Sequence, residues 1–319
     1  MKYFLPVVFC FTLMAACKGP AEKPATDLRI VYNVHYDTAN DNYEVFSMEL
    51  DGSNKKNISN APGVDWVYYA YKDKVYFISD RDTTHRMYFL YVMDADGNNI
   101  SKVTDLRLED SWHNTRNNGK EMIVSGRIGN QIRHQLFVVD TETGEYKPFA
   151  HDTTATFSDP AFSPDGKQLA FRHRQNKRNF KNEKAELWLM PSDGGEKKQL
   201  TTFPADTTAE WFVYHAGPPK WHPTEDLISY QSFRNGKYAL FGIKPGGGEP
   251  WRLIENNNTG LEEGWHSWSP DGQLLAIELS NFDALEVDVY LMDWKTKELK
   301  RLTDARRFEQ APVFVEVKK

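Results

Sequence analysis

A repeated ten-residue segment constrains the fold of this 319-residue chain more than any other feature. Residues 162–171 read FSPDGKQLAF, and residues 268–277 read WSPDGQLLAI. A match that keeps an aromatic residue, Ser-Pro-Asp-Gly and an apolar pair in one register indicates internal repetition. Because Pro fixes φ, Asp can bind backbone groups ahead of it and Gly accepts a positive φ, the tetrad suits a tight turn between strands.

A second pattern indicates the number of repeats. A strand-like triplet of an aromatic residue, any residue and an apolar residue occurs six times, with its third residue at Met48, Met93, Val139, Met190, Ile243 and Met292. The steps between them are 45, 46, 51, 53 and 49 residues. Four short strand patterns separated by turn residues fit into each period, and helical periodicity is nearly absent. We therefore expect an all-β fold, a six-bladed β-propeller of four-stranded antiparallel blades.

The two ends of the repeat array indicate how the ring closes. The first copy begins at residues 28–32 with the second strand of the unit, without an inner strand before it. Residues 310–314, QAPVF, resemble the approach to the first strand in other copies, and Phe314 follows Trp268 by 46 residues, one period. The C-terminal strand is thus predicted to complete blade 1 and to remove an open sheet edge. The propeller is expected to span residues 28–319.

The first 27 residues are expected to lie outside the propeller. Residues 1–16 resemble a lipoprotein signal peptide, because Lys2 precedes an apolar run and small residues precede Cys17, which would be lipidated. An ordinary secretory signal with a chance cysteine is the alternative. Residues 17–27 are polar and contain two prolines, as in a tether. We expect a bacterial envelope protein on the periplasmic or cell-surface side of the outer membrane, touching the membrane only through its lipid.

The charge balance bears on the kind of partner. Loss of Lys2 leaves 38 of the 39 basic residues against 45 acidic ones, a net charge of −7 for the mature chain. An acidic protein of this kind is not expected to bind nucleic acid. We expect a monomer whose partner is a protein, a peptide or a glycan.

The repeats resemble those of one known family. The two Ser-Pro-Asp-Gly segments, with LWLMPSDGGEKKQLT at 187–201 and VYLMDWKTKELKRLT at 289–303, are similar to the repeats of TolB-like propellers. The resemblance covers residue 28 to the C-terminus and is strongest in the fourth and sixth copies. It implies a periplasmic or cell-surface location and a binding role. TolB itself carries an α/β domain before its propeller, where this sequence has only the tether, so the resemblance implies no specific role in the Tol complex.

The first strand of each blade supplies the candidate binding residues. In a propeller these strands line the central channel, and the loops that lead into them ring one face. Polar or aromatic residues in these segments are predicted to form a binding site at the channel mouth: Asp110, His113, Asp159, His222, Glu263, Trp265, His266 and Glu309. The alternative is that they are solvated or turn-bonded groups, His222 simply replacing the Ser of the tetrad.

Catalysis is the less favoured interpretation. The sequence has no G-x-S-x-G elbow, H-E-x-x-H motif, cysteine pair or P-loop. Imidazole and carboxylate groups meeting at the channel could nevertheless hold a divalent metal, with His113, His222 and His266 as the ligands. A metal-dependent lyase or hydrolase acting on a polysaccharide is therefore kept as the alternative to a binding or scaffold protein, and no cofactor is expected for the favoured function.

Two insertions extend the candidate surface. Residues 172–184, RHRQNKRNFKNEK, are basic within an acidic protein, and Arg174, Lys177 and Arg178 could dock an acidic partner. Residues 202–219 are rich in aromatic side chains, and Trp211 and Tyr214 could cover a ligand. The alternatives are a solvated hairpin loop and a flap packed on the ring.

Overall fold

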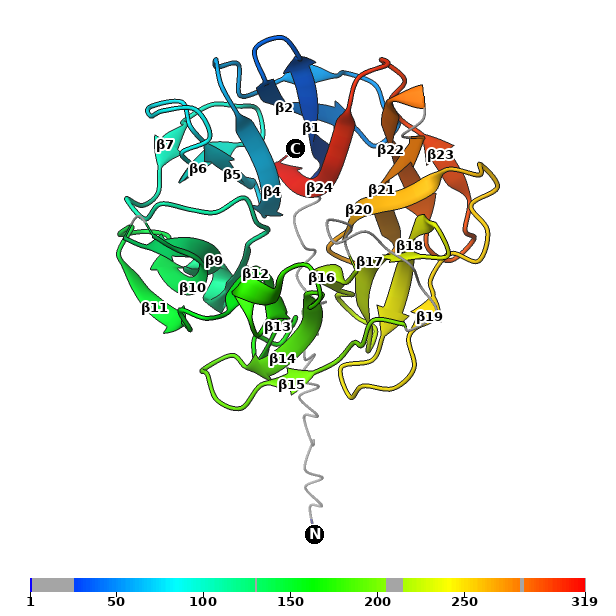
Figure 1. The fold of residues 1–319 in the computed structure, drawn as a ribbon. Coiled ribbons are helices and arrows are strands. Elements are labelled where there is room, and N and C mark those ends of the chain that lie inside the picture. Colours follow the sequence, from blue (N-terminus) through cyan, green and yellow to red (C-terminus); the bar gives the residue numbers. More distant parts are fainter. Residues whose placement is uncertain (2–25, 130, 205–214, 282–283, 319) are drawn as a thin grey trace.

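The chain folds into six blades around a central axis, as the repeats predict (Figure 1). A computed structural model describes Met1 and residues 26–129, 131–204, 215–281 and 284–318. These residues form six antiparallel sheets of four strands each. Helical structure in the described chain is limited to two short 3-10 turns, η1 (Asn117–Gly119) and η2 (Lys177–Asn179).

The first three blades are given with their strands from the channel outwards. Blade 1 consists of β24 (Glu309–Lys318), β1 (Thr26–Asp37), β2 (Asn42–Glu49) and β3 (Lys56–Asn57). Blade 2 consists of β4 (Asp65–Tyr71), β5 (Lys74–Ser79), β6 (Phe89–Asp94) and β7 (Ser101–Lys102). Blade 3 consists of β8 (Asn114–Arg116), β9 (Glu121–Ile128), β10 (Ile132–Asp140) and β11 (Tyr146–Ala150).

The other three blades follow the same order. Blade 4 consists of β12 (Thr156–Phe162), β13 (Gln168–Arg174), β14 (Glu186–Pro191) and β15 (Lys198–Gln199). Blade 5 consists of β16 (Gly217–Trp221), β17 (Ile228–Arg234), β18 (Lys237–Ile243) and β19 (Trp251–Arg252). Blade 6 consists of β20 (Glu262–Trp268), β21 (Leu274–Asn281), β22 (Glu286–Asp293) and β23 (Leu299–Arg301). Each aromatic triplet lies in the third strand of its blade, which confirms the counting of repeats.

The Ser-Pro-Asp-Gly segments form the turns between the first and second strands. Ser163 donates a hydrogen bond from Oγ to Asp165 Oδ1 (2.6 Å), and the same Oγ accepts one from the backbone N–H of Gln168 (2.9 Å). Gly166 has φ +70°, which glycine adopts without strain. The turn of blade 6 repeats this arrangement, with 2.6 Å between Ser269 Oγ and its aspartate.

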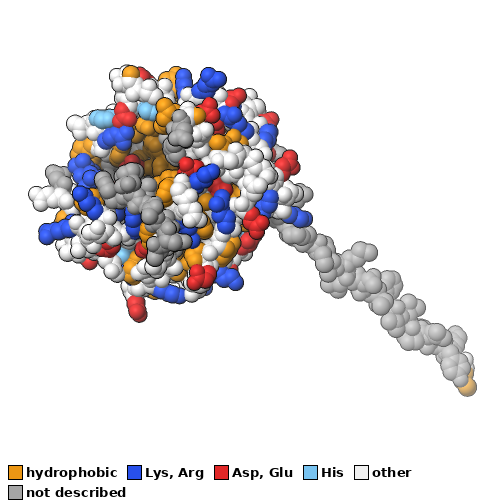
Figure 2. All heavy atoms as spheres, turned by 45° about the vertical axis from the view of Figure 1, so that its right-hand side comes forward, with side chains coloured by type: hydrophobic (Ala, Val, Ile, Leu, Met, Phe, Trp, Pro, Cys, Tyr) orange, Lys and Arg blue, Asp and Glu red, His pale blue; other side chains and the backbone are white. Residues whose placement is uncertain are grey.

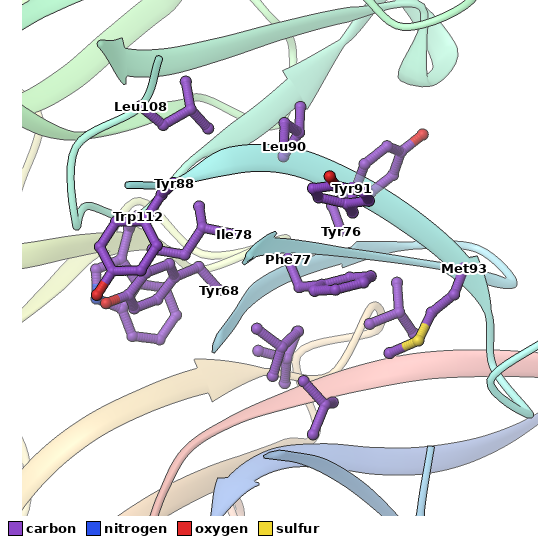
Figure 3. Packing of buried hydrophobic residues seen from close by; sticks show 14 of the residues in the cluster. Tyr68, Tyr76, Phe77, Ile78, Tyr88, Leu90, Tyr91, Met93, Leu108 and Trp112 are labelled. Atoms are coloured by element: carbon purple, nitrogen blue, oxygen red, sulfur yellow. The ribbon is translucent and has the colours of Figure 1, made fainter. Parts of the chain in front are cut away.

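The middle strands read as nearly continuous apolar runs because neighbouring blades cover both of their faces. In β5, residues 75–79 are all buried. Figure 3 shows the largest core cluster, where Phe77 and Ile78 of β5 pack with Leu90 and Met93 of β6. Burial of such side chains contributes about 1.5–3 kcal/mol each, so the blades are held together mainly by apolar packing.

The C-terminal strand closes the ring, as predicted. β24 pairs antiparallel with β1, with Thr26 opposite Lys318 at one end and Val34 opposite Glu309 at the other. The two strands lie side by side in Figure 1. We call the face where the inner strands begin the loop face, and the face where they end, which carries the Ser-Pro-Asp-Gly turns, the turn face. The first described residues of β1 therefore lie at the turn face.

Candidate functional site

The central channel is bordered by every blade. It contains a cavity of about 460 Å³ that reaches the turn face. Its wall includes one or more side chains from each inner strand or the residues beside it, among them Tyr69, His113, Phe162, Lys220, Trp268 and Phe314. A concave site lined by aromatic groups and a few polar ones is typical of a ligand-binding pocket.

Aromatic side chains cross the channel between its two ends. Trp112 of blade 3 and Trp265 of blade 6 come from opposite sides of the ring, yet their ring centroids are 6.2 Å apart. Trp66 meets Trp265 edge to face at 6.0 Å, and Tyr68 lies 4.9 Å from Trp112. Figure 3 shows the rings of Tyr68 and Trp112 next to each other. We call Trp66, Tyr68, Trp112 and Trp265 the aromatic cluster. Because the cavity is lined by Tyr68 and Trp112 but not by Trp66 or Trp265, the cluster separates the cavity from the loop-face mouth.

Lys220 of β16 approaches the aromatic cluster from the cavity. Its Nζ lies 3.3 Å from the ring centroid of Trp112, a cation–π arrangement. Desolvation lowers the pKa of Lys220 well below its ordinary value of 10.5, and the charge of Asp159 acts in the opposite direction. Asp159 is paired with Arg172, with 2.9 Å between Oδ2 and Nε. In the described part of the chain, Lys220 takes part in no ion pair.

Two of the predicted histidines are buried in the channel wall. His113 contacts the rings of Tyr68 and Tyr69 edge to face, and burial lowers its pKa to about 3. His266 is within hydrogen-bond distance of Ser229 (2.7 Å from Nε2 to Oγ), and burial lowers its pKa to about 3 as well. Both imidazoles are therefore neutral near pH 7, and each serves in packing.

The third histidine, His222, takes the place of serine in the turn of blade 5. Its Nδ1 accepts a hydrogen bond from the backbone N–H of Glu225 (2.9 Å), so Nε2 carries the proton that it donates to the carbonyl of Gly272 (3.1 Å) in the next blade. A Cβ at Gly272 would lie 2.4 Å from His222, so the contact requires glycine. Within residues 26–318, excluding the undescribed positions, no three His, Cys, Asp or Glu side chains form a group that could hold a metal ion.

Asp110 and Trp265 are the predicted residues that lie at the loop-face mouth. The hydroxyl of Tyr68 donates a hydrogen bond to Asp110 Oδ1, which joins this carboxylate to the aromatic cluster. Asp110 is exposed and Trp265 is half-exposed. Desolvation by surrounding groups nevertheless raises the pKa of Asp110, as expected for a carboxylate inside a hollow. Figure 2 shows a hollow in one face of the molecule, with hydrophobic side chains in it and charged ones around it.

The other predicted carboxylates connect neighbouring blades. Asp159 of blade 4 accepts a hydrogen bond from the backbone N–H of Trp112 in blade 3 (3.2 Å), and so helps to present that ring to the channel. Glu263 of blade 6 is buried and paired with Arg252 of blade 5 (2.8 Å). Glu309 is buried at the start of β24. Asp159 and Glu263 therefore join neighbouring blades.

The basic insertion forms an ordered loop. Arg174 is partly buried and donates from Nε to the carbonyl of Glu183 (2.9 Å). Lys177 lies in η2, and Arg178 is exposed. The exposed ring of Phe180 lies in the same loop. The described loop thus presents exposed basic and aromatic side chains, Arg178 and Phe180.

Three further predicted residues, Cys17, Trp211 and Tyr214, lie outside the described residues. In the described part of the 202–219 insertion, Phe203 packs edge to face on His215, with 4.1 Å between ring centroids. A search of the described residues finds no helix with the length and apolar character needed to cross a membrane.

Sequence reasoning missed Trp66, Trp112 and Lys220. Trp66 could have been found from the sequence, because it lies one residue after an acidic residue, Asp65, at the start of its inner strand. Trp265 lies in a similar place, two residues after Glu263. Aligning the inner strands by register would have placed these rings at one depth in the channel. Lys220 carried no signal, since lysine is common in any acidic soluble protein.

Relatives in sequence match only part of the chain. No protein-family model matches it. An uncharacterized peptidase of Bacillus subtilis, YuxL, is 30% identical over 93 residues, which make up 29% of this chain and 12% of the peptidase. The Tol-Pal system protein TolB of Francisella tularensis is 31% identical over 85 residues, 27% of this chain and 19% of that protein. The aligned segments thus cover less than a fifth of either relative.

Solved structures match over most of the chain. TolB from Acinetobacter baumannii has a TM-score of 0.68 at 16% identity, over 90% of this chain and 66% of that one. A putative TolB from Agrobacterium tumefaciens has a TM-score of 0.59 at 15% identity, over 90% and 92%. The fold is that of a TolB-like propeller. An oligogalacturonate lyase in complex with manganese shares the ring at a TM-score of 0.55 and 14% identity, over 86% and 73%.

Proposed function

We propose that this chain is a monomeric binding protein of the bacterial envelope, which recognises a protein, peptide or glycan through its loop-face mouth and inserted loops. The observation that carries the proposal is the mouth itself: an exposed carboxylate, Asp110, beside the half-exposed rings of Trp66 and Trp265. Half-exposed aromatic groups and a carboxylate on a rigid ring are suited to recognition. A protein ligand is favoured, because the similar TolB proteins are named for the Tol-Pal system.

The position of the N-terminus supports this choice of face. Thr26 begins β1 at the turn face, opposite Lys318. A lipid on Cys17 would be joined to Thr26 by residues 18–25, which reach at most about 30 Å when extended. The turn face would then lie toward the membrane, and the loop face would point away from it, open to a partner.

Site-specific photo-crosslinking tests the proposal in the native envelope. Benzoylphenylalanine in place of Tyr36, an exposed residue near the loop-face end of β1, is expected to capture a discrete partner. The same group in place of Thr224, exposed in a turn of the turn face, is the matched control. Capture from Thr224 alone, or from neither position, would contradict binding at the loop face.

A metal-dependent lyase has no specific observation in its favour. The manganese-bound lyase shares the ring, but at 14% identity this likeness concerns the fold alone. His222 already uses both ring nitrogens in hydrogen bonds, and His113 and His266 are buried in packing. We therefore propose the binding function alone.

A further inference from the structure

Asp110, a carboxylate at the loop-face mouth, forms no ion pair within the described residues. Asp110 has one hydrogen bond within the described chain, from the hydroxyl of Tyr68. Asp110 is an exposed residue, so a ligand can approach it from the mouth. Surrounding groups desolvate it, so it has lost part of its hydration without gaining an ion pair. A carboxylate in such a place gains more from a bound cation than one in open water.

Several arginines of the surrounding blades pair with carboxylates other than Asp110. Arg86 pairs with Asp41 on the rim (2.8 Å), and its charge reaches Asp110 only at longer range. Arg133 pairs with Glu109 (2.8 Å). In blade 4, Arg172 pairs with Asp159, as described above. Arg127 pairs with Glu109 as well (2.5 Å). None of these arginines forms an ion pair with Asp110 in the described chain.

Lys220 does not pair with Asp110 in the described chain. It lies in the cavity on the turn-face side and covers the ring of Trp112, and its pKa responds to Asp159 rather than to Asp110. The aromatic cluster therefore separates a basic group on one side from an acidic group on the other.

Half-exposed aromatic rings stand beside the carboxylate. The ring of Tyr43 lies 4.6 Å from that of Trp66, which in turn meets Trp265 edge to face. All three are half-exposed, and the Tyr43 hydroxyl is near enough to Asp41, Arg86 and Asp110 for their charges to act on it. Indole and phenol faces attract organic cations, most strongly where water is partly excluded. Rings and carboxylate together match the chemistry of a cation, and the carboxylate disfavours an anionic ligand.

We propose that the loop-face mouth binds an organic cation, namely a lysine or arginine side chain of a protein partner, between the rings of Tyr43, Trp66 and Trp265 and the carboxylate of Asp110. This inference rests on the proposed binding function and names the chemistry recognised there. A protruding side chain of this kind reaches the floor of the hollow, while the rest of the partner contacts the rim.

Titrations with small probes test the inference. The purified mature chain is titrated with Nα-acetyl-lysine methylamide and Nα-acetyl-arginine methylamide, followed by tryptophan fluorescence and by NMR of the indole N–H groups. The neutral analogues with norleucine and citrulline side chains are the matched controls. We expect saturable shifts with the cationic probes and binding weaker by about tenfold or more with the neutral ones. A further arm uses tetramethylammonium: tighter binding of this ion than of both side-chain probes would overturn the assignment to a protein side chain.

Variants connect binding to the named residues. Asp110→Asn keeps the shape of the side chain and is expected to weaken the binding of the cationic probes by about tenfold. Asp226→Asn removes an exposed carboxylate from the turn face and is expected to change nothing. Near-UV circular dichroism shows whether each variant folds. If Asp110→Asn does not fold, Trp66→Leu is the second variant expected to weaken the binding of the cationic probes. Unchanged probe affinity in either folded variant would refute the inference.

The two proposals can fail separately. A partner captured at Tyr36 but held equally well by Asp110→Asn would leave the binding function standing and refute the cation site. Probe binding that depends on Asp110, with no partner captured at Tyr36, would establish the cation site and contradict the proposed function.

Discussion

Glu278 in β21 is a buried carboxyl group whose ionisation should weaken the fold. Its Oε2 accepts a hydrogen bond from the backbone N–H of Ala311 in β24 (2.9 Å). Gly264 packs so closely on it that a Cβ there would lie 2.2 Å from Oε1, so little water can reach the group. Burial raises the pKa of Glu278 from 4.5 to about 7.

The sign and size of the effect follow from linkage. Between about pH 4.5 and 7, the folded chain holds a proton on Glu278 that the unfolded chain has released, so the free energy of unfolding falls as the pH rises. At about 1.4 kcal/mol per pH unit between the two pKa values, the ionised carboxylate lowers the free energy of unfolding by about 3 kcal/mol at most. Glu278→Gln keeps an acceptor for Ala311 and removes the charge.

Urea unfolding of both proteins from about pH 4.5 to about pH 8, followed by tryptophan fluorescence, measures the difference. We expect similar stability at the acidic end and a variant that is more stable by up to about 3 kcal/mol at the basic end. Buried histidines such as His113 and His266 titrate identically in both proteins and cancel in the difference. Glu298→Gln, at an exposed site, is the control. A difference that does not change with pH would refute the reasoning.

Four further outcomes are expected. His222→Ala should lower the free energy of unfolding by about 1–3 kcal/mol, because the N–H of Glu225 and the carbonyl of Gly272 lose their partner; unchanged urea unfolding would contradict this role. Deletion of residues 309–319 should abolish cooperative unfolding, since blade 1 loses its inner strand; a retained two-state transition would argue against closure by β24. Lys220→Met should raise the Tm by removing a desolvated ammonium group, whereas a lower Tm would show that its contact with Trp112 outweighs desolvation. Addition of Zn²⁺, Mn²⁺ or Ca²⁺ should leave the Tm of the metal-free protein unchanged, and a clear increase would revive the metal site.

The blade count and the ring closure could be predicted because both depend on short-range patterns. An aromatic triplet and a Ser-Pro-Asp-Gly turn each reflect a local backbone requirement, and both recur at one period. The segment at 310–314 is predictable as an inner strand because it resembles the approach to the first strand in other copies and places Phe314 one period after Trp268.

The site was only partly predictable, because it depends on which side chains meet across the ring. Asp110 and Trp265 were placed at the channel mouth from their position before or within an inner strand. The sequence could not show that Trp112 and Trp265, which are 153 positions apart along the chain, meet across the channel. Nor could it distinguish Glu263, which an arginine neutralises, from Asp110, which has no such partner in the described chain.

The pairing of β1 with β24 also determines how the molecule would bear mechanical force. A pull on the N-terminus enters at Thr26 and acts along β1, which is hydrogen-bonded to β24 on one side and to β2 on the other. The load is therefore applied in shear, so many hydrogen bonds resist together instead of opening one by one. A propeller closed in this way could be pulled at the start of β1 without its first blade separating from the ring.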